Sequence, residues 1–414
     1  MSESAALLSP SPRNATAQHA RISVRLVLLL GALTAFVALS IDMYLPALPS
    51  IGRQLGSSAG DAQITLSTFF AGLAIGQFLY GPASDRWGRR GPLLFGIAVY
   101  VLASAACAFA PSIPLLAAAR FIQALGGAAG PVIARAAVRD RFGARDSARV
   151  LSLLMLVMGL APIIAPFLGA GLLAVLSWRA IFAVLTLFGT IMGVATLIGL
   201  RETRSAETAV QARSEHPVRG YLALLGQPVL VGYMMSGAFN SAALFTYIAA
   251  APGVVMGFYG VPPSHFVWVF GANAASLIAM SQLNAHLLRR MTPERLLVLA
   301  RPFSLLFGLV MAVDATTGFG GLWGVLAPLF CLFGSFGFIM PNTMAAGLSL
   351  DPRRVGSASA LMGGVQFGVG AVISALVAAT HDTGPRPLAY AVLASMVAST
   401  VALYAIAMPR RAKA

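Results

Sequence analysis

Two ionisable residues lie inside long apolar stretches of this sequence. Asp42 stands late in the apolar run from Leu26 to Leu48, and Arg120 stands alone in another apolar run. An ionisable side chain inside a bilayer is costly, and such residues usually serve an ion, proton or substrate pathway. A lone acid and a lone base in membrane-spanning helices are typical of a proton-coupled transporter.

We expect both residues in the outer half of the membrane. Asp42 stands about 6–10 Å below the outer end of the first expected span, and Arg120 about 11–12 Å into the fourth, at roughly 1.5 Å per residue. Both then face a common cavity, with Asp42 as proton carrier and Arg120 as its modulator. An apolar surrounding favours a protonated carboxyl and a nearby guanidinium favours an ionised one. The alternative is a structural pair that joins two helices.

A second group of charged residues follows the second apolar run. The segment Gly81-Pro82-Ala83-Ser84-Asp85-Arg86-Trp87-Gly88-Arg89-Arg90 combines glycines for a tight turn with one acid and three arginines. Fixed charges at this boundary can pair with neighbouring helix ends and hold one conformation closed, and Asp140 is the expected partner of Arg89. The alternative is a basic loop with a turn. The predicted cytoplasmic gate comprises Gly81, Asp85, Arg86, Gly88, Arg89, Arg90 and Asp140.

Sparse polar side chains within the apolar runs are candidates for substrate contact. Asn240 and Tyr247 are seven residues apart and so share one helix face, as do Arg120 and Gln123. Each of these residues can instead serve helix packing or hydrogen bonding between helices. The predicted substrate-binding residues are Asp42, Tyr44, Arg120, Gln123, Asn240, Tyr247 and Gln366.

The composition indicates an integral membrane protein. Of the 414 residues, 58% are hydrophobic and 10% are charged, which is outside the range of soluble domains. The net charge of +15 comes from arginines clustered between apolar runs, a membrane topology signal rather than a nucleic-acid surface. A bilayer needs about 20 apolar residues per helix. The expected spans are 25–47, 62–82, 91–110, 113–136, 149–173, 178–200, 227–250, 264–285, 297–315, 320–344, 356–379 and 385–408.

Basic residues predict the orientation. With the N-terminus inside, 24 of the 28 lysines and arginines fall on the cytoplasmic side, Arg301 among them, and three fall outside, with Arg120 in the membrane. This asymmetry predicts that both termini are cytoplasmic. The polar segment after the sixth span divides the chain into two halves, which suggests alternating access. The expected parts are an N-terminal tail (1–24), a six-helix half (25–200), a central loop (201–220), a second half (221–408) and a C-terminal tail (409–414).

The loop from Gly81 to Arg90 resembles the G-x-x-x-D-R-x-G-R-R signature of the major facilitator superfamily. The resemblance implies that Asp85 and Arg89 exchange partners during transport. A narrower resemblance, to the Bcr/CflA branch of drug/proton antiporters, covers most of the chain. It is carried by Asp42-Met43-Tyr44-Leu45-Pro46-Ala47-Leu48-Pro49, by Gly260 to Asn284, by Pro341-Asn342, and by Gly356-Ser357-Ala358-Ser359-Ala360 through Gln366.

These observations predict an all-α, twelve-span protein of the bacterial inner membrane that exports small, moderately lipophilic compounds in exchange for protons. Bicyclomycin-like and chloramphenicol-like molecules are implied by the resemblance, and so is a monomer. The alternative is a transporter of the same fold that moves a physiological metabolite. No cofactor, metal, nucleic-acid partner or enzymatic activity is expected, because the five histidines are scattered and no G-x-x-x-x-G-K loop is present.

Overall fold

The fold is described from a computed structural model. It describes residues 24–57, 59–142, 144–204, 217–351, 354–382 and 384–408. The expected terminal tails, apart from Val24, and most of the expected central loop lie outside these residues. Within them every regular element is helical, which confirms the all-α prediction.

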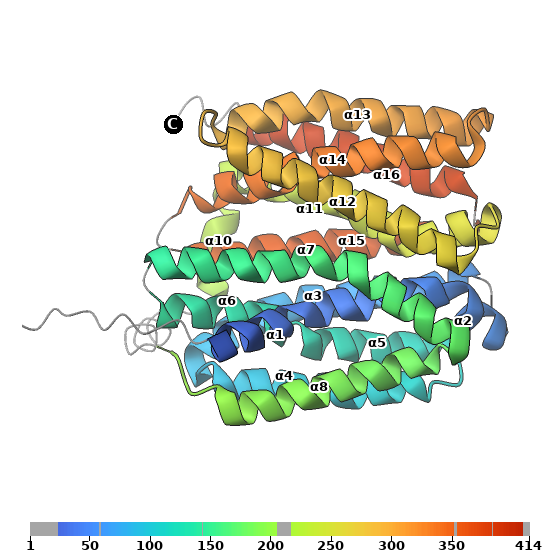
Figure 1. Cartoon of the computed structure of the whole chain (residues 1–414). Coiled ribbons are helices and arrows are strands. Elements are labelled where there is room, and N and C mark those ends of the chain that lie inside the picture. The colour runs from blue at the N-terminus through green and yellow to red at the C-terminus, as the bar shows by residue number, and fades with distance from the viewer. Residues whose placement is uncertain are drawn as a thin grey trace, which may run out of the picture.

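Figure 1 shows the helices running side by side, with the N-half (α1–α8) in the lower part of the view, the C-half (α11–α16) mostly above it, and α15 of the C-half drawn beside α7. We call the end at which α1 begins the inner end, which the sequence predicts to be cytoplasmic, and the opposite end the outer end. The N-half contains α1 (Val24–Asp42), η1 (Leu45–Ala47), α2 (Leu48–Gln54), α3 (Ala59–Trp87), α4 (Arg90–Ala108), α5 (Ile113–Gly127), α6 (Ala129–Arg141), α7 (Ala144–Val175) and α8 (Arg179–Gly199).

The short helix α10 (Pro217–Leu225) lies at the inner end, between the two halves in sequence. The C-half contains α11 (Pro228–Ala251), η2 (Pro252–Phe258), α12 (Pro263–Leu287), α13 (Pro293–Thr317), α14 (Gly321–Leu348), α15 (Val355–Ala378), α16 (Pro385–Val401) and η3 (Ala402–Ala407).

Eleven helical segments among the described residues are long and apolar enough to cross a bilayer. The remaining expected span corresponds to the 32-residue helix α7, whose segment Leu160–Val175 is a shorter apolar helix. The twelve-span prediction therefore agrees with the arrangement of the helices.

The first span differs from its prediction because its helix breaks in the middle of the apolar run. Helix α1 ends at Asp42, and the chain continues through η1 and α2. Each of these short helices has a proline at its first or second position, Pro46 and Pro49. Proline suits a helix start but cannot donate to a preceding turn, so these residues start new helices rather than extend α1.

The ninth span begins at Pro293, earlier than the predicted residue 297, and the charge count that put Arg301 on the cytoplasmic side is wrong. Thr292 caps α13, its side chain accepting a hydrogen bond from the Arg295 N–H. Arg301, counted on the cytoplasmic side although the expected span 297–315 contains it, lies inside α13 and is 1% exposed. Arg120 is not the only cation buried well inside a span.

The two halves meet along α3 and α15. Near the outer end the hydroxyls of Ser67 and Ser374 are 2.9 Å apart, and nearer the inner end Gly81 faces Ala360. Also at the outer end, His381 Nδ1 lies 3.2 Å from Asp61 Oδ1 of the opposite half. Helices α2 and η2 also touch there.

Candidate functional site

Asp42 occupies the break at the end of α1 and is nearly inaccessible, with 4% of its surface exposed. Its carboxylate interacts electrostatically with Tyr247, which belongs to α11 in the opposite half. Helix α7 approaches this break closely, because a Cβ on Gly169 would collide with the Met43 carbonyl. Asp42 is thus held where three helices from both halves converge.

Arg120 lies in the core of the N-half and is completely buried. Its guanidinium stacks over the rings of Phe69 and Tyr44, 4.0 Å and 4.6 Å from their centroids. It donates a hydrogen bond of 2.6 Å to Gln123 Oε1, and Gln123 donates one of 2.7 Å to Ser104. Aromatic faces attract a cation strongly when water is excluded, which offsets part of the cost of burying this charge.

The predicted pairing of Asp42 with Arg120 is absent from the described interactions. No ion pair or hydrogen bond between these two described residues is present. After the helix break it is Tyr44 that contacts the guanidinium, while the Asp42 carboxylate acts on Tyr247 of the C-half. The two charges therefore belong to different surroundings in this conformation.

The other predicted substrate residues fall into two groups. Tyr44 and Gln123 lie around Arg120 in the N-half, where the Tyr44 hydroxyl is 2.8 Å from that of Thr65. Asn240, Tyr247 and Gln366 lie in the C-half, and Gln366 Nε2 approaches α11 at Gly237, one turn from Asn240.

The C-half group combines aromatic walls with unused polar atoms. Tyr247 accepts a 2.8 Å hydrogen bond from Asn273, and its ring meets Phe333 edge-on at 4.8 Å. Asn240 is fully buried, and neither its amide nitrogen nor its oxygen has a partner among the described residues. A buried amide without partners is costly, so Asn240 is suited to water or to a polar group of a ligand.

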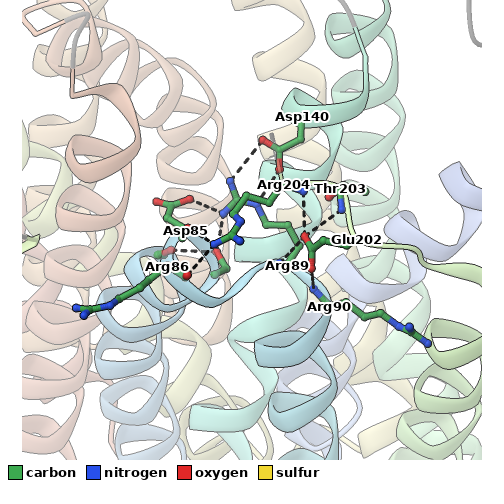
Figure 2. A network of polar contacts seen from close by, with 10 residues as sticks. Asp85, Arg86, Arg89, Arg90, Asp140, Glu202, Thr203 and Arg204 are labelled. Atoms are coloured by element: carbon green, nitrogen blue, oxygen red, sulfur yellow. Dashed lines mark hydrogen bonds and ion pairs between the residues drawn. The ribbon is translucent and has the colours of Figure 1, made fainter. Parts of the chain in front are cut away.

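Figure 2 shows a connected polar network that includes five of the predicted gate residues, Asp85, Arg86, Arg89, Arg90 and Asp140. Arg89 is 4% exposed and donates to three acceptors: Asp140 at 2.7 Å, Ser84 at 2.8 Å, and Asp85. The contact predicted between Arg89 and Asp140 is therefore present. Burial alone would lower the pKa of Arg89, but Asp140 and Asp85 raise it above its ordinary value, so this guanidinium stays charged.

Gly88 is required by the shape of this turn. Its φ is +92°, a conformation that side chains with a Cβ rarely adopt. A Cβ at this position would also collide with the carboxylate of Glu202. The glycine therefore lets the loop lie directly against the chain that follows α8.

Sequence reasoning missed Glu202 and Arg204, which hold this loop from the other side. Glu202 accepts hydrogen bonds from the backbone N–H groups of Arg89, at 2.8 Å, and Arg90, at 3.3 Å. Arg204 donates to the backbone carbonyls of Asp85, at 3.1 Å, and Arg86, at 2.6 Å. The available signal was an acid directly after the sixth span, in a segment otherwise rich in arginine.

Replacing Glu202 with glutamine is expected to destabilise the protein at neutral pH but not in acid. Burial disfavours the Glu202 carboxylate, but hydrogen bonds from the backbone N–H groups of four residues outweigh burial and hold its pKa below the ordinary value. A carboxyl of this kind stabilises the fold above its unfolded pKa of about 4.3 and loses that effect as pH falls through the folded pKa. Thermal unfolding in detergent at several pH values measures the difference between wild type and Glu202→Gln.

The difference should be largest near pH 7 and should shrink below about pH 4. A constant difference across this range would contradict the assignment. Arg201→Gln, which changes the exposed neighbour of Glu202, is the matched control and should show no such trend.

A pocket at the inner end lies between the predicted gate residues and the C-half. Gly81, Asp85 and Arg89 of the gate line it, opposite Ser357 and Ala360 near the start of α15. These three predicted gate residues thus border a space between the halves. The other four, Arg86, Gly88, Arg90 and Asp140, are not among the residues that line this pocket.

No group of three or more histidine, cysteine, aspartate or glutamate side chains among the described residues can hold a metal ion. Cys107 is buried and Cys331 is exposed, and both are free thiols. The arrangement offers buried charge, amides and aromatic walls, which suit binding and proton exchange.

Comparison with known proteins gives consistent results. The family model described as Major Facilitator Superfamily matches residues 30–375. The bicyclomycin resistance protein homolog of Haemophilus influenzae is 32% identical over 378 residues, covering 91% of this chain and 95% of that protein. The chloramphenicol resistance protein of Pseudomonas aeruginosa is 29% identical, covering 85% and 84%. A crystal structure of a D-xylose-proton symporter superposes with a TM-score of 0.70 at 14% identity, covering 93% and 98%, and shows the likeness of fold.

Proposed function

The chain belongs to the major facilitator superfamily, in its Bcr/CflA drug-antiporter branch, and on that premise we propose that it exchanges protons for small, moderately lipophilic organic compounds. As a transporter of this family it is a multi-pass protein of the bacterial inner membrane and not an enzyme. The names of its relatives, a bicyclomycin resistance protein homolog and a chloramphenicol resistance protein, support drug export as the direction and class of transport.

The burial of Asp42 is the observation that carries the proposal. Asp42 is an acid buried at a helix break, 4% exposed, and near enough to Tyr247 of the opposite half to interact with it electrostatically. Rocking of one half against the other changes the water and charge around such a group, and with them its affinity for a proton. In our proposal Asp42 loads a proton when the outer end is open and releases it to the inner side when substrate binds.

The driving force is sufficient for useful export. One proton moving down a potential of 100 mV supplies about 2.3 kcal/mol. That free energy sustains a roughly 50-fold gradient of a neutral substrate. No prosthetic group is needed for this exchange.

The other predicted residues have supporting roles in this scheme. Arg120 keeps a fixed positive charge behind Tyr44 and so biases the field near the coupling site. Asn240, Tyr247 and Gln366 supply hydrogen bonds and an aromatic wall for substrate. The Arg89 network holds the inner-end turn in a defined shape and so governs access from the cytoplasm.

Proton release on substrate binding tests the proposal. Purified protein in weakly buffered detergent is mixed with chloramphenicol, and the pH of the medium is followed. We expect acidification that saturates with the drug, because bound drug displaces the proton from Asp42. Absence of a pH change with chloramphenicol and bicyclomycin, together with unchanged drug sensitivity of a deletion strain, would favour a transporter of a physiological metabolite instead.

A further inference from the structure

The C-half contains a buried cation that the proposed transport cycle does not use. Arg301 lies eight residues after the start of α13, about 12 Å along the helix, and is 1% exposed. Its Nη2 donates a hydrogen bond to the Ser236 hydroxyl of α11. Helix α13 is thereby joined to α11 inside the half.

Ser236 belongs to a polar seam between α11 and α16. The hydroxyls of Ser236 and Ser399 are 3.3 Å apart, and Ser399 also donates to the Ser236 carbonyl. Because the two helices are antiparallel, the next turn brings Asn240 and Ser395 to the following level. Both are buried, and their side chains also have atoms without partners among the described residues.

The guanidinium of Arg301 has N–H donors without a hydrogen-bond acceptor. Its Nε and Nη1 have no hydrogen-bond partner among the described residues, which leaves three N–H groups unused. Ser399 uses its proton on the Ser236 carbonyl, so Ser236 is left to donate to the Ser399 oxygen. Ser236 accepts only from Arg301 Nη2, and neither hydroxyl accepts from Nε or Nη1.

The charge of Arg301 also lacks a counter-ion among the described residues. No ion pair joins it to a described carboxylate. On its own helix, Glu294 is two turns away at the inner end, and the Asp314 carboxylate accepts from Gly320 at the outer end. An isolated buried charge with unused donors is strongly unfavourable.

We propose that Arg301 and the adjoining seam between α11, α13 and α16 form an internal site for a small inorganic anion of the chloride class. Such an anion accepts several N–H bonds at once and neutralises the guanidinium. The burial of Arg301 keeps lipid phosphate groups and larger anions away from it. The bound ion ties three helices of the C-half together, independently of proton exchange at Asp42.

The test compares chloride with gluconate at equal ionic strength. Anything that binds the folded state stabilises it by mass action, so chloride should raise the unfolding temperature of the purified full chain in detergent. We expect a saturable rise of about 2 °C or more and broadening of the chlorine NMR line of wild-type protein. Bromide should compete for the site, whereas gluconate should not.

Variants separate this site from surface effects. Arg301→Gln should lose both the chloride-dependent rise and the line broadening. Arg295→Gln, which removes an exposed charge from the same helix, should keep both. The proposal is overturned if wild type behaves identically in chloride and gluconate, which would mean that water alone fills the site, or if Arg301→Gln responds like wild type. If Arg301→Gln does not fold, bromide displacement of the wild-type chlorine signal decides alone.

Discussion

Asp42→Asn is expected to abolish proton-driven drug export while leaving the protein folded and inserted. Asparagine has nearly the same volume as aspartate and cannot exchange a proton, so the break at the end of α1 keeps its shape. Because Asp42 is only 4% exposed, the neutral amide also relieves the cost of burying a charge. Drug uptake into inverted vesicles under an imposed pH gradient should fall to the level of vesicles without the protein.

Two comparisons separate coupling from general damage. Asp382→Asn changes an exposed carboxylate at the outer end, where an amide oxygen can still accept from Gly384, and it should export normally. Counterflow of drug without a pH gradient measures exchange that needs no proton, and Asp42→Asn should retain more of it than of driven transport. Full export by Asp42→Asn against a gradient would remove Asp42 from the mechanism.

The spans were predictable because burial of charge in lipid is expensive. Each apolar run had to be a helix, and each cluster of arginines had to lie at its end. The helix break at Asp42 was harder to see because the residues around Pro46 and Pro49 remain apolar. Hydropathy measures transfer into lipid and does not register that proline starts a new helix.

Arg301 was misplaced for a related reason. An arginine near the inner end of an expected span is readily assigned to the cytoplasmic side, because its long side chain can reach the interface. Here Thr292 and Pro293 start the helix two turns before Arg301. The Ser236 hydroxyl accepts a hydrogen bond from the Arg301 guanidinium inside the C-half. The partner lies on another helix, far away in sequence.

The depth of the candidate site residues in the membrane could be predicted from the sequence, but the direction in which their side chains point could not. Counting residues along a helix places Asp42 and Arg120 at similar depths, but the rotation of each helix about its axis depends on packing against its neighbours. Arg120 turned toward Phe69 and Tyr44. Arg89 and Asp140 did meet, because charges at the same end of adjacent helices have few other partners.

Arg89→Ala is expected to destabilise the protein by about 3 kcal/mol, because removing one partner of a buried ion pair leaves the other charge buried and uncompensated. Asp140 carries most of this cost, since its side chain is 9% exposed whereas that of Asp85 is 44% exposed. The turn also loses the side chain that joins α3 to α6. Thermal unfolding in detergent should show the loss of stability, and drug export should fall with it.

Partner variants test whether the network acts as a unit. Asp140→Ala combined with Arg89→Ala should cost less than the sum of the two single changes, because contacting residues are not independent. Arg89→Lys should fall between wild type and Arg89→Ala, since a single ammonium cannot reproduce the planar fork that spans Asp140, Ser84 and Asp85. Arg201→Ala removes an exposed arginine nearby and should change neither property. Equal effects of Arg89→Ala and Arg201→Ala would mean that the inner-end turn keeps its shape without the buried guanidinium. The proposed gate would then have to depend on the contacts made by Glu202 and Arg204.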